Sequence, residues 1–86
     1  MTYVVSLKRT AEKELERLPT KIHDRIVKHL NSLKEQPRPV SSKKLRGREG
    51  YRTRVGAYRI LYAVDDSEKK IEIYSVAHRK EAYRNV

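Results

Sequence analysis

Apolar residues recur with a helical period in the first half of this chain. The first stripe, at i, i+4 and i+7, consists of Ala11, Leu15 and Leu18. A second stripe begins beyond Pro19 and consists of Ile22, Ile26, Val27, Leu30 and Leu33. Each stripe is one face of an amphipathic helix, and Thr10 and Thr20 are the expected N-caps. Because the connection between the stripes is short, the two helices should form an antiparallel hairpin.

The second half of the chain alternates with a period of two, which is typical of β-strands. Residues 51–55 place one set of side chains, Tyr51, Thr53 and Val55, on one face and Arg52 and Arg54 on the other. Gly56 and Ala57 have the length and composition of a two-residue hairpin turn. Residues 58–64 continue the alternation, and residues 71–77 follow a polar turn as the last strand.

Two shorter segments complete the predicted architecture. Residues 3–7 are a run of β-forming residues, and residues 44–46 are a candidate short strand. Together the elements predict an α+β fold, in which an N-terminal strand and a helical hairpin pack on a small antiparallel β-sheet. The chain has no internal repeat or linker, so we expect a single domain over residues 1–86.

Length and composition exclude several classes of function. The 86 residues allow one modest core, and the absence of cysteine excludes disulfides, thiol catalysis and Cys-ligated zinc. The three histidines are scattered, with no carboxylate pair at ligand spacing, so we expect no metal site and no other cofactor. No segment has the apolar length of a signal peptide or a membrane span. The expected location is therefore cytoplasmic, without a membrane partner.

Positive charge is concentrated in one part of the sequence. Lys and Arg number 21 against 11 Asp and Glu, which gives a net charge of +10. Residues 38–59 carry eight basic side chains and one acidic side chain, a net charge of +7. Arg52 and Arg54 point the same way from one strand, and Arg59 follows just across the predicted turn. A lone arginine on a strand is often merely solvated, but a cluster of this size favours an anionic partner.

A second group of functional side chains follows the last predicted strand. It combines an imidazole, guanidinium groups, an ammonium group and a phenol, from His78, Arg79, Lys80, Tyr83 and Arg84. If residues 79–83 form a helical turn, Arg79 and Tyr83 lie on one face of it. The other two histidines, His23 and His29, fall on the second predicted helix and are expected to be solvated.

Taken together, these motifs resemble the RelE/ParE toxin superfamily, and most closely its RelE branch from bacterial and archaeal toxin–antitoxin systems. The resemblance covers essentially the whole chain and is carried by LRG at 45–47, YRILY at 58–62 and HRKEAYR at 78–84. It implies a compact fold like that of microbial ribonucleases. It also implies an endoribonuclease that cuts mRNA at the ribosomal A site and inhibits translation. An acidic RelB-like antitoxin is the implied partner.

The resemblance further implies which residues take part. By position, the basic catalytic cluster corresponds to Arg52, Arg54, Arg59 and Arg79, with Tyr83 as the C-terminal aromatic residue. His78 is added from its chemistry as a candidate acid or base. RNA contacts are expected from the remaining basic residues of the two groups, Lys43, Lys44, Arg46, Arg48, Lys80 and Arg84. The toxin alone is expected to be monomeric and to form a larger complex with its antitoxin.

Cleavage without a metal requires the 2′-hydroxyl to attack the adjacent phosphate. Arginines stabilise the charge that builds on the phosphate oxygens, and Arg59 and Arg79 are expected in that role. The best-studied family pattern has lysine at positions 52 and 54, whereas arginine is effectively never deprotonated. Another group must therefore carry the proton. Positive surroundings favour phenolate at Tyr83, and the imidazole of His78 titrates near neutrality, so both remain open.

Two other functions remain open from the sequence. A ParE-like toxin would share this fold but inhibit DNA gyrase, although the retained Arg59, Arg79 and Tyr83 favour the nuclease. A non-catalytic RNA- or ribosome-binding module would use the basic sheet only for phosphate contacts. In that module every arginine loss weakens binding by a similar amount. In the enzyme, loss of Arg59 or Tyr83 removes cutting and leaves binding nearly intact.

Overall fold

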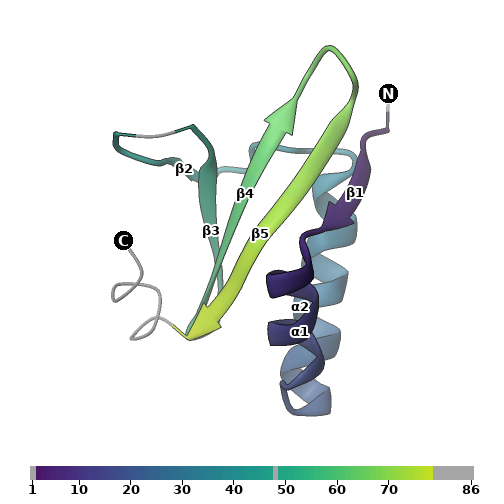
Figure 1. The fold of residues 1–86 in the computed structure, drawn as a ribbon, viewed down its shortest axis with the longest axis vertical. Coiled ribbons are helices and arrows are strands. Elements are labelled where there is room, and N and C mark those ends of the chain that lie inside the picture. Colours follow the sequence, from purple (N-terminus) through teal and green to yellow (C-terminus); the bar gives the residue numbers. More distant parts are fainter. Residues whose placement is uncertain (1, 48, 79–86) are drawn as a thin grey trace.

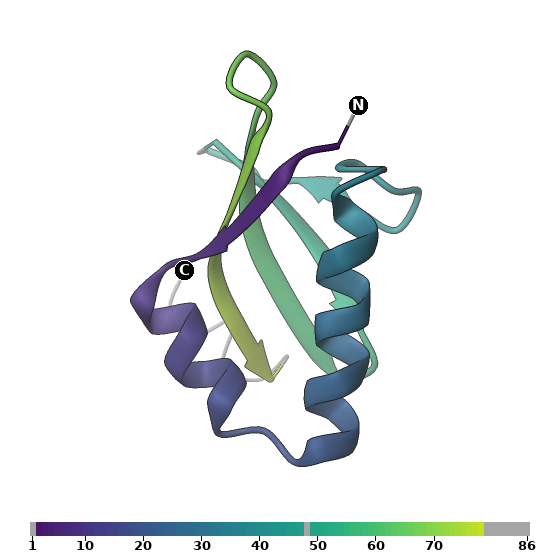
Figure 2. The same cartoon turned by 90° about the vertical axis from the view of Figure 1, so that its right-hand side faces the viewer.

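The computed structural model describes residues 2–47 and 49–78, which form two helices on one face of a five-stranded sheet (Figure 1 and Figure 2). The elements in chain order are β1 (Val4–Leu7), α1 (Arg9–Glu16), α2 (Thr20–Leu33), β2 (Lys43–Lys44), β3 (Tyr51–Val55), β4 (Tyr58–Asp65) and β5 (Lys70–His78). This arrangement confirms the predicted α+β class. None of the described helices has the length and apolar character needed to cross a bilayer.

The sheet has the strand order β1-β5-β4-β3-β2. The pairs from β5 to β2 are antiparallel, as predicted. β1 instead pairs in parallel with β5, with Val4 opposite Lys70 and Leu7 opposite Ile73. The sheet is therefore mixed, and the first strand extends its edge rather than packing on it with the helices. Parallel pairing is possible because the helices carry the chain away from the end of β1 across one face.

Both helices begin without the predicted side-chain caps. α1 starts directly after Lys8 and α2 directly after Pro19, and neither N-cap residue makes a side-chain hydrogen bond. Capping by Thr10 and Thr20 was thus a wrong prediction. The backbone N–H of Lys8 donates to the carbonyl of Ile73 over 2.8 Å. Pairing with β5 therefore continues to Lys8 and sets the point where α1 begins.

The core lies between the helices and one face of the sheet. Its buried side chains include Ala11 and Leu15 from α1, Ile26, Leu30 and Leu33 from α2, and Ile60, Tyr62, Ile71, Ile73 and Val76 from the sheet. These residues occupy the helical and period-two stripes that the sequence pattern predicts. The opposite face of the sheet carries no described helix (Figure 2).

The β3–β4 hairpin has the predicted two-residue turn. Val55 pairs with Tyr58, and Gly56 has a φ of 59°, in the left-handed region that glycine adopts without steric cost. This turn fixes the register of the two strands. As a result, Arg54 lies directly opposite Arg59.

Candidate functional site

Four basic side chains gather on the sheet face that points away from the helices. The register pairs Lys43 with Arg52 and Arg54 with Arg59. Because side chains alternate along a strand, all four lie on the same face. We call Lys43, Arg52, Arg54 and Arg59 the basic cluster. It crosses β2, β3 and β4, and it confirms the prediction that Arg59 lies across the hairpin from Arg54.

The members of the basic cluster differ in exposure. Lys43 and Arg54 are exposed, Arg52 is half-buried, and Arg59 is only 5% exposed. On β4, Arg59 lies between Arg54 of β3 and Ala77 of β5. A guanidinium keeps its charge when buried, and its attraction for an anion is stronger away from bulk water. Arg59 therefore places its charge in the shielded centre of the cluster, whereas Lys43 and Arg54 present theirs to solvent.

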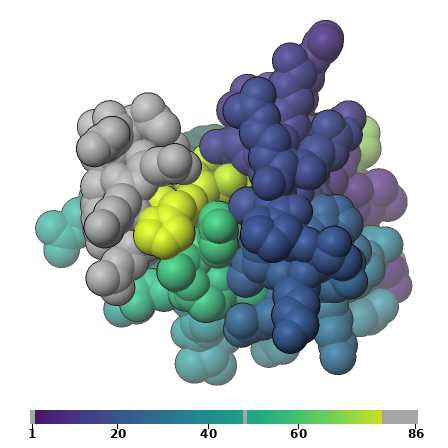
Figure 3. All heavy atoms as spheres, turned by 90° about the horizontal axis from the view of Figure 1, so that it is seen from below, coloured from purple at the N-terminus to yellow at the C-terminus, as the bar shows by residue number. Residues whose placement is uncertain are grey.

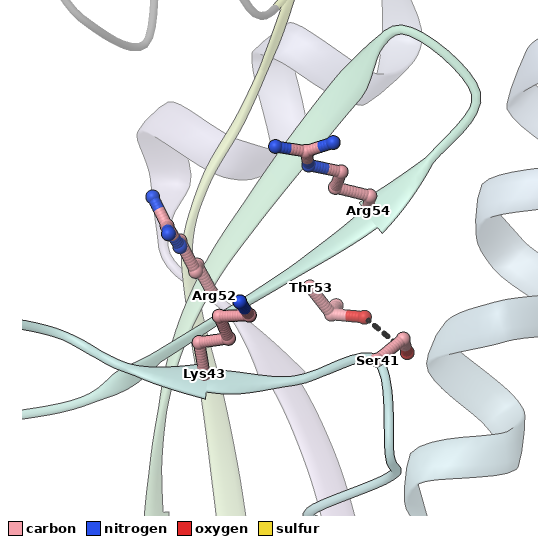
Figure 4. A pocket seen from close by; sticks show the side chains of 5 residues that line it. All are labelled: Ser41, Lys43, Arg52, Thr53 and Arg54. Atoms are coloured by element: carbon pink, nitrogen blue, oxygen red, sulfur yellow. Dashed lines mark hydrogen bonds between the residues drawn. The ribbon is translucent and has the colours of Figure 1, made fainter.

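A pocket opens beside the basic cluster at the edge of β3 (Figure 4). It has a volume of about 220 Å³ and is lined by Ser41, Lys43, Arg52, Thr53 and Arg54. Figure 4 shows Arg52 and Arg54 extending to one side of β3, while the hydroxyl of Thr53 points toward Ser41. A water molecule takes about 30 Å³ in the liquid. The pocket therefore has room for a phosphate group.

His29 is half-buried and contacts the sheet, whereas the sequence predicted a solvated side chain. Its Nε2 lies 3.0 Å from Oγ1 of Thr53, and burial lowers the pKa of its imidazole. Thr53 is fully buried, and its Oγ1 also lies 3.2 Å from Oγ of Ser41. A signal was present in the sequence, because His29 stands three residues after Ile26 and four before Leu33. That spacing places it beside the apolar stripe.

His78 lies at the end of β5 and outside the basic cluster. It pairs with Tyr58, and the two rings meet edge to face with their centroids 5.5 Å apart. This register puts His78 on the same side as Tyr58, whereas Arg59 points to the other side. Figure 3 shows the end of β5 (yellow) beside the β3–β4 hairpin (green). The register therefore does not favour the predicted acid–base role of His78 at the basic cluster.

The remaining predicted site residues have different locations. Lys44 pairs with Tyr51, so it lies on the helix-facing side of the sheet, apart from Lys43. Arg46 is exposed in the loop after β2. The others lie outside the described residues, namely Arg48, Arg79, Lys80, Tyr83 and Arg84. Among residues 2–47 and 49–78, His, Asp and Glu side chains form no group of three suited to a metal ion.

Arg38 belongs to the basic segment of the sequence but serves the fold. Its Nη2 lies 2.7 Å from Oδ2 of Asp66, and its Nε donates to the hydroxyl of Tyr51 over 2.9 Å. The same guanidinium lies over the Tyr51 ring, 5.2 Å from its centroid. These contacts tie the connection between α2 and β2 to the β4–β5 turn. The charge of Arg38 is thus balanced within the molecule.

Comparisons with known proteins give consistent matches. The family described as the ParE toxin of the type II toxin–antitoxin system parDE matches residues 5–83. Toxin RelE of Mycobacterium tuberculosis is 34% identical over 84 residues, which span 95% of this chain and 87% of the relative.

Two solved complexes have similar structures. A chain of the toxin–antitoxin complex RelBE2 from Mycobacterium tuberculosis has a TM-score of 0.80 at 34% identity, over 92% of this chain and 100% of that one. A chain of the archaeal RelE–RelB complex from Pyrococcus horikoshii has a TM-score of 0.79 at 29% identity, over 92% and 97% of the two chains.

Proposed function

We propose that this chain, which belongs to the RelE branch of the RelE/ParE superfamily of type II toxin–antitoxin toxins, cuts mRNA in the ribosomal A site and so inhibits translation. The observation that carries the proposal is the basic cluster on the sheet face opposite the two described helices. The helices occupy the other face with the core. A polyanion that meets the basic cluster therefore need not displace the described helices or the core.

The proposed reaction is attack of a ribose 2′-oxygen on the adjacent phosphorus. A bond forms from the 2′-oxygen to phosphorus, and the bond to the 5′-oxygen breaks. The 2′-hydroxyl loses its proton, and the leaving oxygen gains one. Arg59 and Arg79 stabilise the charge on the phosphate oxygens, while Arg52, Arg54 and Lys43 hold the flanking backbone. This division follows the exposure of the cluster, because Arg59 is the least exposed of its members.

Proton transfer is assigned to Tyr83 in this proposal. Arginine does not release its proton, and His78 points away from Arg59. Cationic groups around a phenol favour its phenolate form, so a larger fraction is able to accept a proton near neutral pH. The reaction needs the 2′-oxygen, the phosphorus and the leaving 5′-oxygen in line, and no single side chain imposes that arrangement. We therefore propose that the ribosome positions the mRNA and that free RNA is not cut.

Primer extension on mRNA in programmed ribosomes, beside the same mRNA alone, tests the nuclease. We expect cuts confined to the A-site codon. Arg59→Ala should slow them about 10²- to 10³-fold, in line with losing one stabilising donor, and Tyr83→Phe should abolish them. Lys21→Ala, an exposed change on α2, is the control and should cut normally. Absence of cuts with a protein whose circular dichroism shows a folded state would contradict the proposal.

A second candidate is inhibition of DNA gyrase. It is favoured by the family match, whose description names the ParE toxin. A supercoiling assay with purified gyrase separates the two functions. Inhibition of gyrase together with intact mRNA on ribosomes would establish the second function in place of the first.

The proposed partner, besides mRNA and the ribosome, is an acidic RelB-like antitoxin. Two solved structures similar to this chain are complexes of RelE with RelB, and the net charge of +10 calls for an acidic binding partner. We propose that the toxin alone is a monomer and that the antitoxin brings it into a larger complex.

A further inference from the structure

A chain of three polar side chains connects α2 to the pocket at the edge of β3. Nε2 of His29 lies 3.0 Å from Oγ1 of Thr53, which lies 3.2 Å from Oγ of Ser41. Thr53 is fully buried, whereas Ser41 is exposed and lines the pocket. The chain therefore runs from the half-buried imidazole to a side chain that lines the pocket, and Figure 4 shows its last step, from Thr53 to Ser41.

The direction of these hydrogen bonds depends on where the proton of His29 is. When Nε2 carries a proton, it donates to Thr53 and Thr53 donates to Ser41. The hydroxyl proton of Ser41 is then available to the pocket. When Nε2 carries no proton, Ser41 donates to Thr53 and Thr53 donates to His29. Ser41 then offers only lone pairs to the pocket, and these repel an anion.

We propose that Ser41 donates a hydrogen bond to a phosphate group bound in the pocket, and that His29, acting through Thr53, is the positioning residue for this hydroxyl. Lys43, Arg52 and Arg54 line the same pocket, so a bound phosphate meets both positive charge and a neutral donor. The identity of the ligand as an RNA phosphodiester rests on the proposed function. The phosphate site itself rests only on the pocket and the hydrogen-bonded chain.

Phosphate binding and protonation of His29 should favour each other. A protonated imidazole always donates from Nε2, whereas a neutral one does so in only one tautomer. Burial lowers the pKa of the imidazole in the free protein. A bound phosphate favours the form of His29 that donates from Nε2, so phosphate binding should raise this pKa. By reciprocity, affinity rises as the pH falls through that pKa. The charged groups on the neighbouring elements are Arg25 on α2, Arg52 and Arg54 on β3, and Lys43 beside Ser41.

The test uses the full chain and a 2′-O-methyl RNA trinucleotide without a terminal phosphate. This probe cannot be cut, and its charge is constant between about pH 5 and 8, where imidazoles titrate. NMR titration of the His29 ring gives its pKa with and without probe, and fluorescence competition gives affinity. We expect the pKa to rise on binding, and Ser41→Ala to weaken affinity about three- to tenfold.

Variants of Thr53 separate the hydrogen-bonded chain from simple charge attraction. Thr53→Val keeps the shape but removes the hydroxyl, so affinity should fall as in Ser41→Ala, with most of the rise in His29 pKa lost. Thr53→Ser restores the hydroxyl and should restore both. Ser6→Ala, an exposed serine on β1 at the other edge of the sheet, should change neither.

Two results would overturn the proposal. One is unchanged affinity in Ser41→Ala, and the other is a rise in the His29 pKa that is as large in Thr53→Val as in the wild-type chain. Melting curves of each variant show whether it is folded. Failure of the two proposals is distinguishable. Normal pKa coupling without A-site cuts would overturn only the nuclease, and A-site cuts with Ser41→Ala binding normally would overturn only the role of Ser41.

Discussion

At the scale of single residues, Arg38 forms contacts within the molecule, whereas Arg54 faces solvent. Arg38 makes two hydrogen bonds to Asp66, and Tyr3 donates to the same carboxylate over 2.6 Å. Arg54 is exposed within the basic cluster. An anion that bound Arg38 would compete with Asp66, whereas Arg54 presents its guanidinium to solvent.

Asp66→Asn should reduce the dependence of stability on acid pH. Its hydrogen bonds with Arg38 and Tyr3 hold the pKa of the Asp66 carboxyl at about 2, below its ordinary value of 3.8. A carboxyl with a lowered pKa stabilises the fold above its unfolded pKa, and that stability is lost as the pH falls toward the folded value. Thermal melts between about pH 4 and 2 should therefore show a shallower decline of Tm in the variant.

The neighbouring carboxylates provide the control for this experiment. The backbone N–H of Glu68 lowers the pKa of Asp65 as well, so part of the acid dependence should persist in Asp66→Asn. Glu68→Gln removes a carboxylate from the same turn without touching Arg38 and is the matched variant, so a slope as shallow as that of Asp66→Asn would show that the Arg38 contact is not the cause. Equal slopes for Asp66→Asn and the wild-type chain would show that the Arg38 contact contributes no stability.

At the scale of elements, two neighbours in turn cover the outer edge of β5. β1 pairs with it as far as Ile73. Farther along, Glu14 of α1 accepts a hydrogen bond from the backbone N–H of Val76 over 3.0 Å and one from the hydroxyl of Ser75 over 3.3 Å. An open strand edge is a site for unwanted pairing. Beyond the end of β1, Glu14 therefore provides the acceptor that the backbone of β5 needs at this edge. β5 in turn pairs with β4, the strand that carries Arg59.

Glu14→Ala should destabilise the fold by about 1–3 kcal/mol, because the N–H of Val76 loses its acceptor. Glu14→Gln keeps a carbonyl oxygen and should cost less. Urea unfolding measures the free energy, and hydrogen exchange should show faster exchange at the Val76 amide. Glu12→Ala removes an exposed carboxylate from the same helix and serves as the control. A loss in Glu12→Ala equal to that in Glu14→Ala would contradict the assignment.

At the scale of the whole molecule, the layered fold separates stability from binding. The two described helices cover one face of the sheet (Figure 2) and enclose the apolar core. The strand register places the basic cluster on the other face. The described helices therefore do not neutralise the charge of the face that carries the basic cluster. Such a surface attracts a polyanion over a distance, and the attraction weakens with salt.

Binding to a 2′-O-methyl RNA oligonucleotide should weaken steeply with salt, and Lys43→Gln should reduce that steepness. For single strands, each phosphate contact contributes about 0.7 to the slope of log affinity against log salt concentration, so the slope should fall by about 0.7 in this variant. Fluorescence anisotropy at several salt concentrations measures it. Lys21→Gln, an exposed change on α2, should leave the slope unchanged. The same slope in Lys43→Gln and the wild-type chain would place the RNA elsewhere.

Local patterns in the sequence were sufficient to predict most of the helices and strands, and the grouping of three arginines of the basic cluster. The stripes ending at Leu18 and Leu33 predict the helices, because a helix buries residues at a fixed spacing. Alternation likewise places Arg52 and Arg54 on one face, and the glycine of the turn brings Arg59 opposite Arg54. These features depend on neighbours a few residues away. They could therefore be derived from the sequence without knowledge of distant contacts.

The tertiary structure decided the features that depend on distant partners. The parallel pairing of Val4 with Lys70 joins segments far apart in the chain, and no periodicity specifies that choice. The contact between His29 and Thr53 and the burial of Arg59 likewise depend on how the layers meet. The burial of a side chain and its hydrogen-bond partners are properties of the packed molecule, because each depends on residues that only folding brings together.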